Sequence, residues 1–159
     1  MSCDTPRELT VRERVDMLFL KVNIDGRAES SSYEHLHEMI EAVEAAGEHD
    51  GWPPDLAFKV TLVVDELSQN VIDYSCTEGL NDVLVELTTN PDEITVEVID
   101  DGIPFNPLTD SAPPDLTSAI EDRDPGGLGV HFTKTLMDDV QYSRVEGKNR
   151  VKITARKPR

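Results

Sequence analysis

Cysteine, positive charge and long apolar runs are all scarce in this sequence. The 159 residues include two cysteines, Cys3 and Cys76, which lie far apart and form no CxxC pair. Neither a disulfide framework nor a cysteine-based zinc site is therefore indicated, and a reducing compartment is expected. Lys and Arg number 15 against 32 Asp and Glu, which gives a net charge of −17. Because such a surface repels phosphate backbones and anionic lipids, no nucleic-acid partner and no membrane partner is expected.

No stretch of the chain approaches the roughly 18 apolar residues that a membrane-spanning helix needs. The first residues, MSCDTPRELTVRERVD, are charged where a signal peptide would be apolar, so we expect a cytoplasmic protein. The length suits one ordinary hydrophobic core. We expect a polar tail at residues 1–15 and a single domain at residues 16–156.

The spacing of the apolar residues predicts the secondary structure. In chain order we expect a strand at 17–25, helices at 30–47 and 56–74, a hairpin at 81–99, a helix at 130–139 and a hairpin at 141–157 that turns at Gly147 and Lys148. Residues 103–125 contain five of the ten prolines, which is typical of a functional lid. This order predicts an α+β two-layer sandwich, with helices on one face of a mixed, mostly antiparallel sheet.

Glu66 and Asn70 lie four residues apart in VVDELSQN, and Asp73 follows one turn later. This spacing places a carboxylate and an amide side by side on one helix face. A carboxylate there can orient or deprotonate a hydroxyl, and the neutral amide oxygen suits Mg²⁺. Taken alone, the pair is better explained as part of a solvated helix face.

A second pattern begins where the strand VEVID ends in Asp100 and continues through Gly102 to Pro104 and Pro107. An Asp at a strand end can accept a hydrogen bond from an exocyclic amino group, and a nearby glycine lets the backbone approach a planar ring. The alternative is an acidic turn that leaves an edge strand.

A third pattern is a group of glycines, Gly126, Gly127 and Gly129, that leads directly into a helix. The free N–H groups and the dipole of a helix start can hold phosphates. A flexible hinge before a helix is the alternative. The sequence contains neither GxxxxGK[ST] nor GxGxxG, so the two most common nucleotide signatures are absent.

Together and in this order, the three patterns resemble the motifs of the GHKL ATPase superfamily, which has the Bergerat or histidine-kinase-like ATPase fold. GGLGVHFTKTLMDDVQY is most similar to the third motif of the anti-sigma-factor serine kinases, the RsbW-like family. The resemblance covers roughly residues 16–156.

The resemblance implies that ATP or ADP and Mg²⁺ are cofactors, with Glu66 as the catalytic base and Asn70 as the metal ligand. Asp100 would bind the adenine amino group, and Gly102 would make room for the ring. The full set of implied nucleotide-binding positions is Asn70, Asp73, Tyr74, Asp100, Gly102, Pro104, Gly127, Leu128, Gly129, Val130 and His131. Tyr74 stands where many relatives have a basic residue, and the lid offers one cation, Arg123.

The function implied by this resemblance is an ATP-dependent serine/threonine protein kinase of a partner-switching module. It would phosphorylate a STAS-domain antagonist and sequester a sigma factor, and it could form a homodimer. The alternative is an ATP-gated binding module that does not transfer phosphate. A histidine kinase catalytic domain is disfavoured, because no phospho-accepting histidine helix precedes residue 16.

Overall fold

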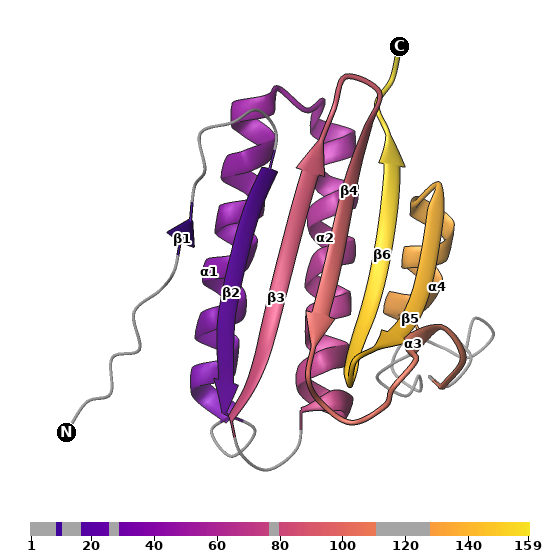
Figure 1. Ribbon diagram of the computed structural model, residues 1–159. Helices are drawn as coiled ribbons and strands as arrows, with labels where there is room; N and C mark the ends of the chain where they lie inside the picture. Colours follow the sequence, from indigo (N-terminus) through magenta and orange to yellow (C-terminus); the bar gives the residue numbers. More distant parts are fainter. Residues whose placement is uncertain (1–8, 11–16, 26–28, 77–79, 111–127) are drawn as a thin grey trace, which may run out of the picture.

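The computed structural model describes residues 9–10, 17–25, 29–76, 80–110 and 128–159. These residues form two layers, with a twisted sheet on one side and the helices on the other (Figure 1). The strands are β1 Leu9–Thr10, β2 Met17–Asp25, β3 Leu80–Thr89, β4 Glu93–Asp100, β5 Asp139–Val145 and β6 Lys148–Arg156. The predicted two-layer α+β sandwich is confirmed.

The sheet has the order β1-β2-β3-β4-β6-β5. Every strand pairing among the described residues is antiparallel, so no parallel component of the expected mixed sheet is found there. The register of β4 and β6 places Asp100 opposite Asn149. Leu9 and Thr10 pair with β2, within the segment expected to be a tail. The remainder of that segment lies outside the described residues.

The helices are α1 Glu29–Asp50, α2 Pro54–Asn70, the short α3 Pro107–Asp110, and α4 Leu128–Leu136. The prediction that the first helix ends at Gly47 was wrong, since α1 continues to Asp50. A Cβ atom at Gly47 would overlap the Trp52 ring, so the glycine makes room for the indole. Trp52 is 7% exposed and belongs to the hydrophobic core.

The last two predicted elements need small corrections. The helix expected at 130–139 ends at Leu136, and Asp139 already begins β5. The following hairpin turns at Glu146 and Gly147, one residue earlier than expected, and both residues have positive φ angles of 52° and 75°. Two such residues form the tight turn whose twist suits antiparallel strands.

The hydrophobic core fills the space between the helices and the sheet. Its least exposed side chains are aliphatic and come from both layers: Val43, Val60, Val63, Val64, Leu67, Val83, Val85, Ile94, Val96, Val98 and Ile153. Alternate residues of β3 and β4 therefore face the helices. Burial of this set fixes α2 against the sheet, and α2 carries two of the expected site residues.

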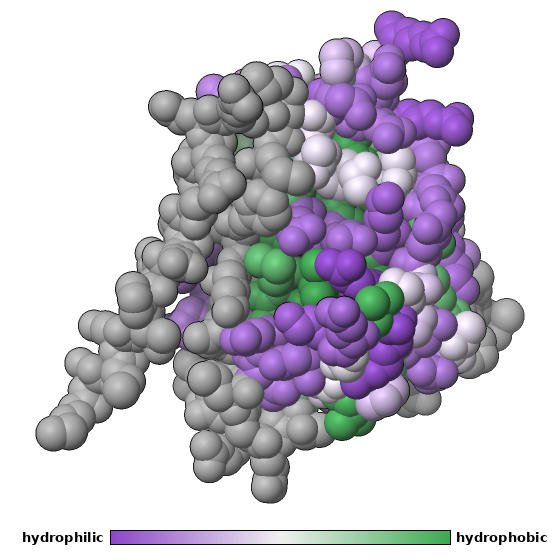
Figure 2. Space-filling model, in the orientation of Figure 1, coloured by the Kyte–Doolittle hydropathy of each residue, from purple (hydrophilic) through white to green (hydrophobic). Residues whose placement is uncertain are grey.

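The other face of the sheet has no helix over it among the described residues (Figure 1). Figure 2 shows this face, where hydrophilic residues surround a smaller apolar region. A shallow polar depression on it is lined by Glu86, Thr88, Thr95, Glu97 and Lys152. In the described part of the chain, no helix is long and apolar enough to cross a membrane.

Candidate functional site

The end of α2 carries the first candidate residues and leads into an unusual turn. Glu66 and Asn70 lie on the last turns of α2, and residues Val71–Ser75 continue as a π-helix. The N–H of Cys76 bonds to the Val71 carbonyl at 2.9 Å, which closes this wider turn. Single π-turns within helices are frequently found at functional sites. This one contains Asp73, Tyr74 and Ser75, and the sequence pattern did not predict it.

Glu66 is partly buried and lies against the start of α4. Burial raises the pKa of the Glu66 carboxyl group, and the negative charge of Asp65 raises it further. A Cβ atom on Gly129 would overlap the Glu66 carboxylate, so Gly129 allows this close approach. The structure thus brings the first and third sequence motifs together. A carboxylate with a raised pKa is a stronger proton acceptor once it is ionised.

Asn70 offers an unpaired amide to a bound group. Its Nδ2 atom is buried and has no hydrogen-bond partner among the described residues, so this donor is open to an acceptor such as a phosphate oxygen. The amide oxygen, Oδ1, is the atom of Asn70 that suits a hard cation. The described residues contain no cluster of three or more His, Cys, Asp or Glu that could hold a metal ion by itself. Magnesium is often held by one or two protein oxygens together with substrate phosphates, and the single amide suits that arrangement.

Asp100 is buried at the end of β4, with 3% of its surface exposed. Its Oδ1 atom accepts hydrogen bonds from the Ser75 hydroxyl, from the Gly102 N–H at 3.0 Å and from Asn149 Nδ2 at 3.0 Å. No described residue donates a hydrogen bond to Oδ2. One oxygen of the carboxylate is therefore held in place, while the other remains free to accept a bond from a ligand.

The loop after β4 packs tightly against the π-turn. A Cβ atom on Gly102 would overlap both the backbone carbonyl and the hydroxyl of Ser75, so only glycine fits this position. The Ile103 N–H also bonds to the Ser75 carbonyl at 3.0 Å. The second motif is thereby fixed to the end of the helix that carries the first.

The aromatic residues near this loop form a stacked pair. The Tyr74 and Phe105 rings lie 5.2 Å apart with an interplanar angle of 18°. Tyr74 is 48% exposed, and Pro104, next to Phe105, is also exposed. Burial raises the pKa of the neighbouring Asp73. The stacked pair forms an exposed apolar patch beside the Asp100 loop, where the sequence places Tyr74 instead of a cation.

The third motif is described from Leu128 onward, because Gly127 lies outside the described residues, as do lid residues 111–125. Leu128 begins α4, and Gly129 and Val130 are buried within its first turn. His131 is partly buried, with its ring 6.1 Å from that of Phe132. No hydrogen bond of the His131 side chain is found among the described residues.

Sequence reasoning missed three residues of this site: Ser75, Asn149 and Arg144. Asn149 is 2% exposed and links β6 to the Asp100 loop through both ends of its amide. The Arg144 guanidinium donates to Asn149 Oδ1 at 2.9 Å and to the Gly102 carbonyl at 3.3 Å. No local pattern in the sequence indicated these residues, because each contacts the Asp100 loop from a distant part of the chain.

Comparison with known proteins identifies the family. The model of the histidine kinase-like ATPase domain matches residues 30–155, which include every candidate residue described above. The chain belongs to this family. An ATPase domain of this kind binds ATP and ADP, and the predicted GHKL resemblance is confirmed.

Several proteins similar to this chain are named as protein kinases. Serine/threonine-protein kinase BtrW of Bordetella bronchiseptica is 29% identical over 108 residues, which cover 67% of this chain and 75% of BtrW. Serine-protein kinase RsbW of Bacillus mycoides is 27% identical, and that of Bacillus cereus is 26% identical, each over 89 residues. These 89 residues are 54% of this chain and 56% of RsbW, so the chain matches about half of the RsbW length.

Proposed function

We propose that this ATPase-family chain is an ATP-dependent serine/threonine protein kinase of a partner-switching regulatory module. The observation that carries the proposal is the meeting of three motifs at one end of α2. Glu66 lies against Gly129, and Ser75 lies against Asp100 and Gly102. The similarity to proteins named serine/threonine and serine kinases supports a protein as the phosphate acceptor.

The proposed base-binding group is the free Oδ2 atom of Asp100. It would accept a hydrogen bond from the exocyclic amino group of adenine, while Oδ1 stays bonded to Ser75, Gly102 and Asn149. Gly102 and Pro104 would lie beside the ring. This geometry favours a 6-amino purine over a 6-oxo purine, since the latter presents an acceptor at position 6, where adenine presents a donor to the carboxylate.

The proposed phosphate-binding groups lie at the start of α4 and the end of α2. The backbone amides of residues 127–131, in Gly127, Leu128, Gly129, Val130 and His131, would face the phosphates. Asn70 would hold Mg²⁺, with Asp73 and Tyr74 nearby on the π-turn. Bound Mg²⁺ would neutralise charge on the β- and γ-phosphates, which phosphoryl transfer requires.

Glu66 is the proposed catalytic base. The serine Oγ of the acceptor protein forms a bond to the γ-phosphorus as the bond from phosphorus to the β,γ-bridging oxygen breaks. The hydroxyl proton passes to the Glu66 carboxylate, and ADP leaves with the electron pair on its terminal oxygen. The raised pKa of Glu66 suits this role, because the proton is bound more tightly there than by an ordinary glutamate.

The proposed partners are those implied by the resemblance of the third motif to the RsbW-like anti-sigma-factor kinases. A STAS-domain antagonist would supply the serine, and a sigma factor or a similar regulator would be sequestered, with a homodimer as the working unit. We further propose a cytoplasmic location and a domain that spans residues 16–156, with a lid at about 103–125. The acidic net charge of −17 suits protein partners better than nucleic acid.

Isothermal titration calorimetry with ATP or ADP in the presence of Mg²⁺ tests the nucleotide site, and circular dichroism checks the fold. We expect binding of both nucleotides by the wild-type protein. A folded protein that binds neither at millimolar concentration would refute the proposal. Binding without transfer to any serine-bearing partner would favour the ATP-gated binding module instead.

A further inference from the structure

Asn149 lies at the centre of a hydrogen-bond network that fixes the orientation of its amide. Its Oδ1 atom accepts bonds from the Tyr142 hydroxyl at 2.7 Å, the Arg144 guanidinium at 2.9 Å and the Phe105 N–H at 3.2 Å. The Arg144 guanidinium and the backbone N–H can only donate. The amide oxygen must therefore point toward the β5–β6 hairpin and the Phe105 backbone.

The other end of the Asn149 amide faces acceptors. Nδ2 donates to the Ile103 carbonyl at 2.7 Å, to Ser75 Oγ at 2.9 Å and to Asp100 Oδ1 at 3.0 Å. A flipped amide would place its oxygen against the Asp100 carboxylate and the Ile103 carbonyl, neither of which can donate while the carboxylate is ionised. The donors on one side of Asn149 thus determine which group is presented to Asp100.

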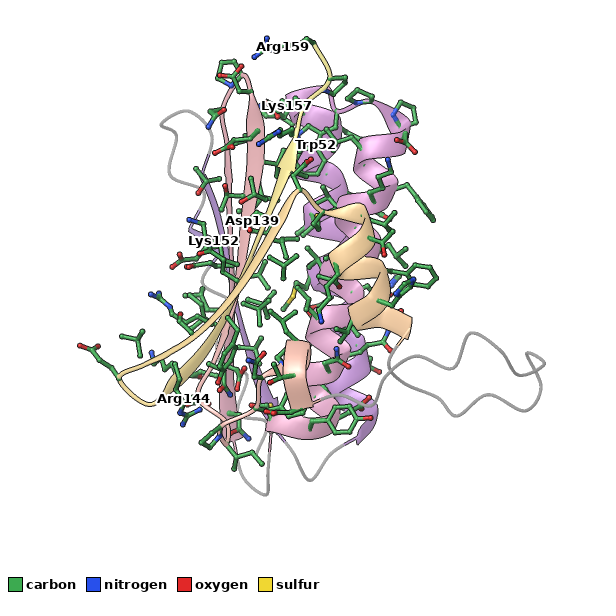
Figure 3. The ribbon with its side chains drawn as sticks, turned by 90° about the vertical axis from the view of Figure 1, so that its right-hand side faces the viewer. Trp52, Asp139, Arg144, Lys152, Lys157 and Arg159 are labelled. Atoms are coloured by element: carbon green, nitrogen blue, oxygen red, sulfur yellow. The ribbon has the colours of Figure 1, made fainter. Side chains whose placement is uncertain are left out.

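Arg144 contributes more to this arrangement than a single bond. Both its terminal nitrogens donate to the Gly102 carbonyl at 3.3 Å, and one also donates to the Gly147 carbonyl at 3.1 Å. Its side chain comes from the β5–β6 hairpin, at the lower left of Figure 3. Arg144 therefore ties the hairpin turn, the Asn149 amide and the Gly102 backbone together.

We propose that Arg144 is a positioning residue for nucleotide-base selection, which acts through Asn149 to hold the Asp100 carboxylate toward a 6-amino purine. The inference rests on the proposed nucleotide site and deepens it. The Arg144 guanidinium bonds to Asn149 and to the Gly102 and Gly147 carbonyls and makes no bond to Asp100 itself. The Tyr142 hydroxyl donates to the same amide oxygen of Asn149, so Tyr142 is a second positioning residue.

The test compares the affinities for ADP and for inosine diphosphate, which carries a 6-oxo group in place of the amino group. Calorimetry on Arg144→Ala should show ADP affinity about fivefold or more weaker, because a hydrogen bond that positions a charged group is lost. Inosine diphosphate affinity should stay near the wild-type value. The ADP preference, meaning the ratio of the affinity for ADP to the affinity for inosine diphosphate, should be smaller still in the double variant Arg144→Ala with Tyr142→Phe.

Arg150→Ala is the matched control, since Arg150 lies on the same hairpin but pairs with Glu97 at 3.8 Å on the sheet face. It removes the same charge and should leave the preference for ADP unchanged. Arg144→Lys, which keeps one donor, should restore part of the preference. If Arg144 had only a structural role, Arg144→Ala would lower the affinities for both nucleotides by the same factor. An unchanged ADP preference in Arg144→Ala would therefore overturn the inference. If the wild type binds neither nucleotide, the proposed nucleotide site itself fails.

Discussion

Asn149 Nδ2 lies 3.0 Å from Asp100 Oδ1, and the two residues face each other across the β4–β6 pairing. The sheet register itself therefore sets the distance between the donor and the carboxylate. Asp100 is held by three donors at one oxygen and keeps the other free among the described residues. A preorganised acceptor of this kind loses little freedom when a ligand binds.

Replacing Asp100 with Asn should weaken nucleotide binding while the fold persists. The new amide places a donor either against the adenine amino group or against the three donors that now meet Oδ1. We expect ATP affinity to fall by about 1–3 kcal/mol, which calorimetry would measure. Asp101→Asn is the control, because Asp101 is exposed and accepts a bond from the Asp82 N–H instead. Equal ATP affinity in Asp100→Asn and wild type would contradict the base-binding role.

The two glycines that allow close approach should differ in their response to alanine. At Gly102 the added Cβ would meet the backbone carbonyl of Ser75, which cannot move without a shift of the π-turn. We expect Gly102→Ala to lower the melting temperature and the nucleotide affinity together. At Gly129 the first obstacle is the Glu66 carboxylate, the end of a flexible side chain. Gly129→Ala should therefore have a higher melting temperature than Gly102→Ala, but it should lose phosphotransfer activity. A lower melting temperature for Gly129→Ala than for Gly102→Ala would be evidence against the tight packing of Gly102 on Ser75.

The raised pKa of Glu66 predicts opposite effects of pH on stability and on catalysis. A carboxyl group with a raised folded-state pKa favours the folded state at low pH, and that contribution is lost as the pH rises through the folded-state pKa. At neutral pH the ionised Glu66 therefore costs stability. Glu66→Gln should raise the melting temperature at pH 7, and the gain should vanish near pH 4, at about the ordinary glutamate pKa. Phosphotransfer by the wild type should decline as the pH falls and Glu66 takes up its proton. An unchanged or lower melting temperature of Glu66→Gln at pH 7 would count against a desolvated Glu66 carboxylate.

Asp50 anchors the opposite end of the molecule, near Trp52 and Lys157 at the top of Figure 3. Burial alone would raise the pKa of Asp50, but hydrogen bonds from Lys157, Thr89 and Trp52 outweigh it and hold the pKa below the ordinary 3.8. Its contribution to stability is therefore present at neutral pH and is lost as the pH falls through the lowered pKa.

Asp50→Asn should lower the free energy of unfolding at pH 7 by about 1–3 kcal/mol, as measured by urea denaturation. The difference from wild type should shrink in strong acid, where the wild-type carboxylate is protonated. Asp55→Asn is the control, because its pair with Lys59 is exposed and should contribute at most about 0.5 kcal/mol. Nucleotide affinity should be unchanged in both variants. A loss of ATP binding in Asp50→Asn would contradict the separation of the two networks.

The sequence sufficed for the parts of this fold that depend on local spacing. The apolar stripe of α2 and the alternation in β3 and β4 predicted the elements that form the core. The i, i+4 spacing placed Glu66 and Asn70 on one helix face without tertiary information, but only the resemblance to the GHKL motifs implied their roles. The end of α1 was misplaced because Gly47 serves Trp52 and does not end the helix.

The remaining features depend on contacts between distant segments. The π-turn at Val71–Ser75 forms where the Asp100 loop bonds to Ser75. The spacing of the apolar residues does not predict it. Asn149 is 49 residues from Asp100 in the chain and looks like an ordinary strand residue until β6 pairs with β4. Arg144 likewise reaches the Gly102 carbonyl only when the hairpin folds back onto the Gly102 loop.

Phosphotransfer to a serine-bearing STAS-domain partner, followed by mass spectrometry, tests the central proposal most directly. The wild-type protein with Mg²⁺ and ATP should add a phosphoryl group to a serine of the partner. Glu66→Ala should bind ATP with nearly wild-type affinity and transfer phosphate about 10²-fold more slowly or worse. Asp55→Ala is the control on the same helix, because Asp55 is exposed, pairs with Lys59 and lies in the first turn of α2, away from Glu66. Transfer at the wild-type rate by Glu66→Ala would contradict the assignment of Glu66 as the base of a protein kinase.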